Sequence, residues 1–394
     1  MSASCLHSLL ALALVTLLHA ADAPERPWEG WEPPSIEMPD PNAFDIYQEA
    51  FRLIDQIGEP DPNADVDALA EHLESHRATF RLLQTALMGD CRPPAVTSAG
   101  QPFPYLADFR RAARLLAARS RVMREYGMYL ESALDAVDAI RMGNDAAGQR
   151  SLISHLVSVA VGSIGLAALE ETLPFLTAAE SLVVLNALRA ARAESVPMAE
   201  MLEGELAFSR LMFRDLMTRV PNAESLYDAE LDTLVEGLPQ TWSPWRSWDA
   251  IGELFESWIK QTSVDAWLAP AEVETKDPFA KLLAPAFEVA FLRGHQAEAR
   301  MALTITAIAC HVWWVENGAP PDSLEELTPG YLPSVPMDPF SGKSLLGPVD
   351  ATGLVIYSVG PDGVDHAGQA IEGPAKQDSV GDITMQLQEP LVEQ

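Results

Sequence analysis

Apolar residues recur three or four positions apart through most of residues 42–220, as in Phe44, Tyr47 and Phe51. Positions three and four apart lie on one face of an α-helix, so each such run predicts an amphipathic helix that turns this face toward a core. Further runs of the same kind follow along the chain. We therefore expect residues 42–270 to form a helical domain, built as an array of helix hairpins.

One stretch of this region, Leu152–Leu169, is rich in Ala, Gly and Val and contains no Asp, Glu, Lys or Arg. Its length suits a membrane span, but it holds His155 and many small residues, and strongly apolar side chains are sparse. We therefore expect a buried central helix rather than a membrane span. After it, Thr177 and Glu180 form a capping box that predicts the start of the next helix.

The pattern changes to alternation toward the C-terminus. A helix is expected over Glu298–Val315, because Asn317 and Gly318 supply the left-handed conformation that ends helices. Short β-type runs follow near Ser344–Leu346, Leu354–Ser358 and Ile383–Leu387. Residues 279–394 are therefore expected to form a small α+β domain with about three antiparallel strands, behind a body that is mainly α.

Several short motifs follow one another in this C-terminal domain. The helix closes on Asn317-Gly318, a Leu-rich turn follows, and a Pro-Met-Asp-Pro-Phe connection leads to a strand, a Gly-Pro-Asp-Gly loop and a final Asp-Ile strand. This order, over about residues 296–387, resembles the C-terminal domain of the major pseudopilin of type II secretion systems. The whole chain resembles exported bacterial proteins with the same tail, a resemblance that implies no activity.

The position of this domain argues against assembly into a fibre. Pseudopilins polymerise through an N-terminal membrane helix that a prepilin peptidase processes. Here the pseudopilin-like domain follows a large helical body. The fragment Gly165–Glu170 superficially mimics a prepilin cleavage site, but the apolar stretch precedes the glutamate instead of following it.

The loop between the last two predicted strands gathers carboxylates and backbone carbonyls, the oxygen ligands that calcium takes in a flexible cage. In the pseudopilin family this loop binds calcium through main-chain carbonyls and aspartates, and one of its paired aspartates falls on Gly381 here. Further aspartates of this longer loop would compensate. The resemblance thus implies a calcium ion held by Val359, Asp362, Asp365, Asp378 and Asp382. The alternative is a metal-free acidic turn, in which Asp-Gly serves only the backbone.

The N-terminus has the pattern of a secretory signal. An apolar run, Leu9–Val15, closes on an A-x-A-like site at Ala20, which predicts a signal peptide over residues 1–20 and export to the periplasm or the extracellular space. No Lys or Arg precedes the apolar run, so a retained N-terminal anchor is the alternative. Residues 21–41 are rich in proline and acidic side chains, which predicts an extended linker whose tryptophans either dock on the body or stay solvated.

Charge narrows the range of partners. The chain carries 57 acidic and 26 basic residues, a formal net charge of −31 at pH 7. A surface of this sign repels phosphate, which excludes nucleic acid and anionic lipid as main partners. We expect an envelope protein or peptide as the partner and no membrane span beyond the signal segment. Cys91 and Cys310 lie in separate segments, so two buried thiols are expected rather than one disulfide.

Motifs of known chemistry are scarce. His72 and His76 stand one helical turn apart, a spacing with which two imidazoles can grip zinc. The string is not His-Glu-x-x-His, so hydrogen-bonded histidines at the edge of a helix are expected instead. His295 and Glu298 form an i,i+3 pair without a second such motif. The sequence contains no Gly-x-Ser-x-Gly, P-loop or Gly-x-Gly-x-x-Gly motif.

Tryptophans are dense in residues 242–267, where they either seal two packed bodies or offer a platform for sugar rings. With no catalytic motif and a helix-rich body, we interpret the chain as an exported, non-enzymatic protein- or peptide-binding or structural protein of the bacterial cell envelope. Its C-terminal module is pseudopilin-like. The alternative is a cell-wall or polysaccharide hydrolase that uses the Trp-rich region as its substrate platform.

Overall fold

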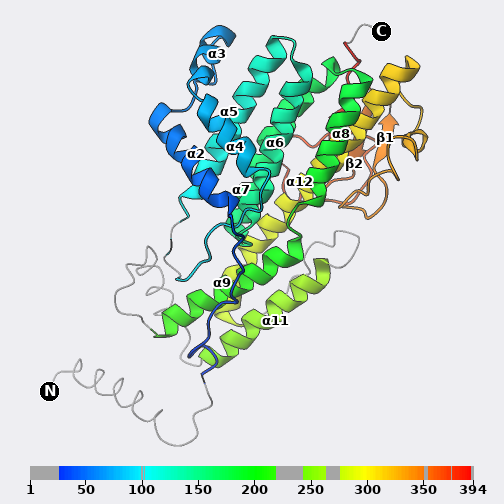
Figure 1. The fold of residues 1–394 in the computed structure, drawn as a ribbon. Helices are drawn as coiled ribbons and strands as arrows, with labels where there is room; N and C mark the ends of the chain where they lie inside the picture. Colours follow the sequence, from blue (N-terminus) through cyan, green and yellow to red (C-terminus); the bar gives the residue numbers. More distant parts are fainter. Residues whose placement is uncertain are drawn as a thin grey trace, which may run out of the picture.

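The computed structural model describes residues 26–98, 101, 103–218, 243–262, 276–349, 354–373 and 375–391. The predicted signal peptide lies outside these residues, as do Trp242 and Trp267 of the Trp-rich region. Within them the chain is mainly helical and carries one three-stranded antiparallel sheet near its C-terminus, which confirms the predicted fold class (Figure 1).

The described helices, in chain order, are α2 (Ala43–Ile57), α3 (Val66–Glu74), α4 (Arg77–Ala86), α5 (Tyr105–Glu125), α6 (Tyr129–Ala147), α7 (Leu152–Thr172), α8 (Ala178–Ala193), α9 (Met198–Thr218), α11 (Pro244–Thr262) and α12 (Pro278–Asn317). The shorter described elements are the 3-10 turns η1 (Leu173–Phe175) and η2 (Leu324–Leu327) and the strands β1 (Leu346–Val349), β2 (Val355–Ser358) and β3 (Ile383–Gln386). Local capping explains several helix starts. The side chain of Asn42 accepts the N–H of Phe44 at α2, and Thr177 and Glu180 form the predicted capping box at α8.

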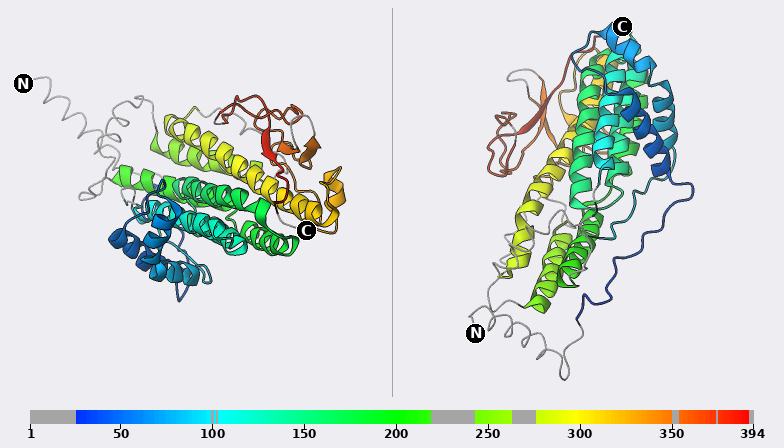
Figure 2. Two further views of the ribbon diagram at one scale, coloured as in Figure 1. Left: turned by 90° about the horizontal axis from the view of Figure 1, so that it is seen from above. Right: turned by 90° about the vertical axis from the view of Figure 1, so that its left-hand side faces the viewer.

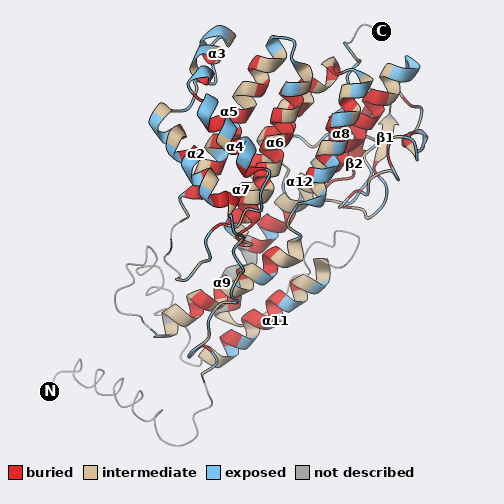
Figure 3. Cartoon of the chain, viewed as in Figure 1, coloured by how far each residue is buried: buried red, intermediate tan, exposed pale blue. Residues whose placement is uncertain are grey.

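Helices α5, α6 and α7 form a central bundle, with α2–α4 on one side and the sheet on the opposite side (Figure 2). Figure 3 shows buried residues concentrated along the inner faces of this bundle. Tyr47 and Phe51 of α2 both contact Phe109 of α5, with ring centroids 5.1 Å apart in each pair. Helix α7 approaches α6 closely at Gly165, where a Cβ would lie 2.5 Å from the carbonyl oxygen of Ala136.

Helix α7 is the most apolar of these helices. Together with η1 it spans Leu152–Phe175, the one described helix that is long and apolar enough to cross a membrane by length and composition. In the fold it packs against α5, α6 and α12 as a central helix. In the most apolar 18-residue stretch of this helix, only 39% of the residues are buried. Some of the others border a cavity. The helix thus keeps an incompletely covered apolar face.

Helix α12 is the longest element, with 40 residues. At 1.5 Å per residue it spans about 60 Å, from beside α11 to the sheet (Figure 1). It begins well before the predicted start at Glu298, because Phe287 packs on Trp258 of α11 with ring centroids 4.3 Å apart and holds the first half of the helix in place. Its end agrees with the prediction, since Gly318 has a φ of 75° and donates its N–H back to the last turn.

The first half of α12 packs with α9 and α11 around an aromatic core. Trp28 of the N-terminal linker is 4% exposed and inserts into this core, against Phe213, Trp245 and Trp248. The described part of the linker therefore docks on the body through a tryptophan, the first of the two alternatives expected for it.

The sheet has the order β1–β2–β3, with both pairs antiparallel. Strands β2 and β3 are in regular register, with Val355 opposite Gln386 and Ser358 opposite Ile383. Strand β1 pairs with β2 through an irregularity and begins at Leu346, slightly later than predicted.

One hydrophobic core joins this sheet to the helical body. Ile356 of β2 and Met385 of β3 lie in the same cluster of buried residues as Leu303 of α12, Leu169 of α7 and Leu185 of α8. The C-terminal segment therefore packs on the helical segment, and it also has a small buried cluster of its own around Phe340 and Val359.

Candidate ligand-binding cavity

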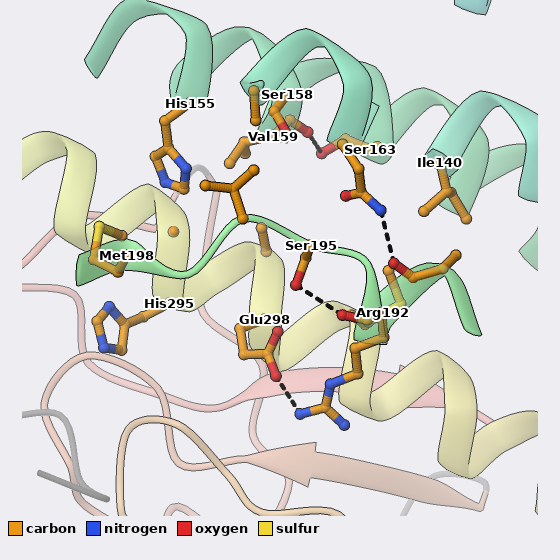
Figure 4. A pocket seen from close by; sticks show the side chains of 18 of the residues that line it. Ile140, His155, Ser158, Val159, Ser163, Arg192, Ser195, Met198, His295 and Glu298 are labelled. Carbon is orange, nitrogen blue, oxygen red and sulfur yellow. Dashed lines mark hydrogen bonds and ion pairs between the residues drawn. The ribbon is translucent and has the colours of Figure 1, made fainter. Parts of the chain in front are cut away.

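A cavity of about 450 Å³ lies between α6, α7, α12 and the connection from α8 to α9 (Figure 4). We call it the α7–α12 cavity. Its volume falls in the range of pockets that bind small molecules or side chains of a partner. Most of the lining is apolar, contributed by Ile140, Ala147, Val159, Leu166, Ala191, Val196, Pro197, Met198, Ala297, Met301 and Pro339.

Helix α7 supplies one wall, with lining residues that lie about one turn apart. His155, Ser158, Gly162 and Leu166 are among them, and this spacing puts them on one face of the helix. A Cβ added at Gly162 would meet nothing within 4 Å. Glycine at this position therefore leaves part of the cavity empty.

The connection from α8 to α9 supplies the opposite wall, and hydrogen bonds fix its path. The hydroxyl of Ser195 donates to the carbonyl oxygen of Arg192 at 2.7 Å, and the side-chain amide of Asn144 donates to the carbonyl oxygen of Ala191 at 2.7 Å. The guanidinium of Arg192 forms an ion pair with Glu298 of α12, which is visible in Figure 4. These polar side chains of the lining are thus paired within the protein.

His155 differs from these groups. Its Nε2 is buried and has no hydrogen-bond partner among the described residues. The ring is directed at α12 where Gly294 stands, and a Cβ at that glycine would lie 2.9 Å from Nε2. Burial lowers the pKa of His155 to about 4, and the nearby His295 adds to this effect. The imidazole is therefore neutral at pH 7.

The second histidine of the cavity has partners. His295 Nδ1 donates to the carbonyl oxygen of Phe291 at 2.8 Å, and the ring lies 6.0 Å from that of Phe340. Burial lowers the pKa of His295, against the opposing influence of that carbonyl and of Glu298. Glu298 itself pairs with Arg192. The two residues of the i,i+3 pair noted in the sequence, His295 and Glu298, therefore bond to different partners.

These contacts define what the cavity can do. The hydroxyl of Ser195 donates to a carbonyl oxygen and not to either histidine, so Ser195 is not paired with a base as a nucleophile would be. An apolar group would fill the volume, and a ligand atom that hydrogen-bonds His155 would relieve a buried unpaired nitrogen. In the sequence, the one indication of this site is a lone histidine, His155, within an apolar run.

The predicted calcium loop has internal partners for its carboxylates. Asp382 is 1% exposed and accepts the backbone N–H groups of His366 and Gly368 at 3.3 and 2.7 Å. Asp362 accepts the N–H of Val364 at 3.1 Å and bonds the His366 ring at 2.9 Å. Burial raises the pKa of Asp382. Burial also opposes ionisation of Asp362, yet its N–H and ring partners prevail and lower its pKa.

The other three predicted ligands have different surroundings. Asp365 accepts the hydroxyl of Tyr357 at 3.2 Å, Val359 is buried, and Asp378 lies exposed in a turn. Among the described residues, no three His, Cys, Asp or Glu side chains form a group able to hold a metal ion. N–H and O–H donors of the loop already bond to Asp362, Asp365 and Asp382, so a calcium ion would share these oxygens with the donors or displace them. Both the calcium site and the metal-free acidic turn stay predictions from the sequence.

Asp338 organises this segment, although sequence reasoning placed it only in a connection. It is 1% exposed and accepts the hydroxyl of Ser358 at 2.6 Å. It also accepts the N–H groups of Val359 and Phe340 at 3.2 and 3.0 Å. One buried carboxylate therefore ties the Pro-Met-Asp-Pro-Phe connection to the end of β2.

His72 and His76 are both hydrogen-bonded, as expected, but they do not share one helix, because His72 lies in α3 and His76 lies in the turn before α4. Their Nε2 atoms lie 3.2 and 3.0 Å from the same carbonyl oxygen, that of Gly58. His76 also bonds the hydroxyl of Thr79 at 3.3 Å, and burial lowers its pKa. The two rings thus fasten the end of α2 to α3 and α4.

Two of the three described tryptophans of the Trp-rich region are buried, and Trp245 is half-buried. Trp248 and Trp258 are 7% and 3% exposed, and Trp258 packs on Phe255 and Phe287. They join α9, α11 and α12, which agrees with a seal between packed elements. These two side chains offer no open platform for a sugar ring.

Comparison of the chain with family models, with curated proteins and with solved structures gave no match. The resemblance to the pseudopilin C-terminal domain remains an inference from the motifs of residues 296–387.

Proposed function

We propose that this chain is an exported, non-enzymatic binding protein of the bacterial cell envelope, and that it holds an apolar segment of a protein or peptide partner in the α7–α12 cavity. The supporting observation is the mostly apolar lining of that cavity, whose polar side chains other than His155 are largely paired within the protein. Burial of one large apolar side chain contributes about 1.5–3 kcal/mol. Such a site binds an apolar group more favourably than a charged one.

The surroundings of the cavity suit a polypeptide partner. Ser163, one of the lining residues, is exposed, and the side chains of the Arg192–Glu298 pair are 31% and 41% exposed. Polar groups at the mouth can therefore meet a backbone while an apolar side chain enters. The net charge of −31 favours a neutral or basic partner over an acidic one.

Gly162 allows a direct test. Gly162→Leu places a side chain in the cavity from a position where its Cβ meets nothing. Gly162→Ala is the matched control, because it brings the same gain in helix propensity and leaves most of the volume open. Partners from envelope extracts should co-purify with the wild type and with Gly162→Ala, and should be lost with Gly162→Leu.

The opposite result is equally clear. Recovery of the same partners with Gly162→Leu, at a melting temperature equal to that of Gly162→Ala, would show that the cavity is not the binding site. Absence of any partner with all three proteins would contradict a binding function in the envelope.

Export is tested separately, because it depends on the predicted signal peptide and not on the cavity. Fractionation of bacteria that express the full chain should recover it from the periplasm or the medium. Recovery from the inner membrane would favour the retained anchor. Recovery from the cytoplasm would contradict export.

A further inference from the structure

A second hollow, of about 310 Å³, runs along β3 between that strand, η1 and the end of α7. We call it the β3 groove. Helix α12 forms its floor with Ala307, His311 and Trp314, none of which lines the α7–α12 cavity. The His311 ring donates from Nε2 to the carbonyl oxygen of Leu176 at 2.8 Å, so this floor is held in place.

The register of the sheet shows which backbone groups of β3 face the groove. Leu387 donates its N–H to the carbonyl oxygen of Leu354, and Met385 pairs with Ile356. Successive residues of a strand turn their N–H and C=O groups to opposite edges. The N–H and C=O groups of Thr384 and Gln386 therefore point away from β2, to the free edge of the sheet.

At its first residue, Asp382, this free edge is already paired with another extended segment of the chain, at Gln369–Ile371. Asp382 donates its N–H to the carbonyl oxygen of Gln369 at 2.8 Å, and Ile371 donates to that of Asp382 at 3.1 Å. This short parallel pairing ends where the chain turns at Gly373, with a φ of 75°. Beyond it, in the described part of the chain, the outward backbone groups of Thr384 and Gln386 have no partner.

The groove leaves room for a single extended chain. Its far end is crossed by the C-terminal tail, where Leu391 donates its N–H to the carbonyl oxygen of Pro174 at 2.7 Å. Walls on both sides disfavour the edge of another folded sheet, which brings its own body with it. The apolar floor, with Ala307 and Trp314, suits an apolar side chain. The net charge of −31 favours a neutral or basic segment.

We propose that the β3 groove receives an extended, neutral or basic segment of a partner protein, which adds to β3 as a fourth strand through the backbone of Thr384 and Gln386. Main-chain hydrogen bonds give affinity in this mode, and alternate side chains that enter the groove give specificity. The site goes beyond the proposed function, because it uses different residues and a different chemistry from the α7–α12 cavity.

Proline at position 386 tests the proposal with little effect on the fold. Gln386→Pro removes an N–H that points away from β2, and edge strands tolerate proline at such positions. Gln386→Ala is the matched control, since it shortens the same side chain but keeps the N–H. A library of random ten-residue peptides is selected on the full-length protein. The enriched peptides should bind Gln386→Pro about tenfold or more weakly, and Gln386→Ala like the wild type.

A second measurement leaves the protein unchanged. Copies of the enriched peptides with methyl groups on alternate backbone nitrogens should lose binding in one of the two methylation frames and keep it in the other, because only one edge of the added strand faces β3. Equal binding in both frames, or equal binding to Gln386→Pro, would overturn the proposal. So would a failure to enrich any peptide, or a dimer of the chain that Gln386→Pro dissociates.

The two proposed sites can fail independently. Gly162→Leu should leave the enriched peptides bound, because Gly162 lines only the α7–α12 cavity. Loss of the peptides with Gly162→Leu would place their binding site in that cavity and overturn strand addition at β3.

Discussion

Two buried carboxyl groups, those of Glu205 and Asp145, show how single residues affect the stability of this protein. Glu205 of α9 is 8% exposed and accepts the N–H of Leu152, at the start of α7, at 2.7 Å. Asp145 of α6 accepts the hydroxyl of the fully buried Tyr47 at 2.6 Å. Burial raises the pKa of each carboxyl to about 7. Both groups therefore couple the stability of the helical body to pH.

The sign of that coupling follows from the direction of the shift. A carboxyl whose pKa is higher in the folded state contributes full stability below its unfolded pKa, which is 4.5 for Glu205, and loses it as pH rises to about 7. Glu205→Gln keeps an oxygen acceptor for Leu152 and cannot ionise. We expect the fall in unfolding free energy between pH 5 and pH 8 to shrink by about 1–3 kcal/mol in this variant, measured by urea denaturation. An unchanged fall, equal to that of the exposed control Glu203→Gln, would contradict this account.

His155 gives a second prediction at this scale. His155→Leu removes a buried nitrogen without a partner, so we expect the unfolding free energy to rise by about 1 kcal/mol. His311→Leu is the matched control, because His311 does have a partner. Its loss leaves the carbonyl oxygen of Leu176 unpaired and should lower stability by about 1–3 kcal/mol. Equal losses in thermal or urea unfolding for both variants would show that His155 is satisfied in solution.

The C-terminal aspartates give a third. The calcium site that the pseudopilin resemblance implies predicts a higher melting temperature of the full chain in millimolar calcium than in excess chelator, and the loss of this difference in Asp362→Ala. An equal melting temperature in both conditions would favour the metal-free acidic turn, in which N–H donors bond to Asp362 and Asp382. Ligand at ten times its dissociation constant would add about 1.4 kcal/mol.

Features set by local chemistry could be predicted residue by residue from the sequence. The capping box at Thr177 and the helix stop at Gly318 depend on neighbours a few positions away, and both occur as expected. Cys91 and Cys310 are also unbonded, as expected, although only Cys310 is buried. The cavity could not be predicted, because it arises where His155 meets Gly294, residues that only the fold brings together.

The start of α12 likewise depends on contacts that only the fold brings together, and not on local sequence preference. The first half of this helix contains Gly294, a poor helix former, and the predicted start lay after it. Packing of Phe287 and Phe291 against α11 overrides that local preference. Gly294 is accommodated because the ring of His155 occupies the space where a side chain would stand.

Helix α7 offers a matched pair of glycines with opposite expectations. Ala at Gly165 would place its Cβ 2.5 Å from a carbonyl oxygen of α6, so Gly165→Ala should destabilise by about 1–3 kcal/mol. Ala at Gly162 meets nothing and gains helix propensity, so Gly162→Ala should stabilise by up to about 1 kcal/mol. Urea denaturation of the two variants tests the arrangement. Effects of the same sign would show that α6 and α7 are not packed as described.

The strands show what short β-type runs can predict. The runs at residues 354–358 and 383–387 locate β2 and β3 closely, and the continuous apolar run of β2 agrees with a strand that is buried at all four positions. Strand β1 begins later than predicted, since its pairing with β2 is irregular and depends on the partner strand. The free edge of β3 follows from the strand order, which no single run specifies.

At the scale of the whole molecule, α12 connects two cores. Its first half packs with α9 and α11, and its second half packs with α6, α7, α8 and the sheet. The α7–α12 cavity lies near the middle of this helix, where the lining residues of α12 extend from Gly294 to Met301. A ligand at this place would contact α7, α12 and the connection between α8 and α9 together.

The central claim is that the α7–α12 cavity receives an apolar segment of a partner protein. Photo-crosslinking in living cells tests it most directly, with p-benzoylphenylalanine at Ser163, an exposed lining residue, and at Ala167 as an exposed control one turn further along α7. We predict a crosslinked partner from position 163 that is absent from position 167 and disappears when Leu replaces Gly162. Crosslinks that are equal at both positions, or unaffected by Leu at position 162, would contradict the account.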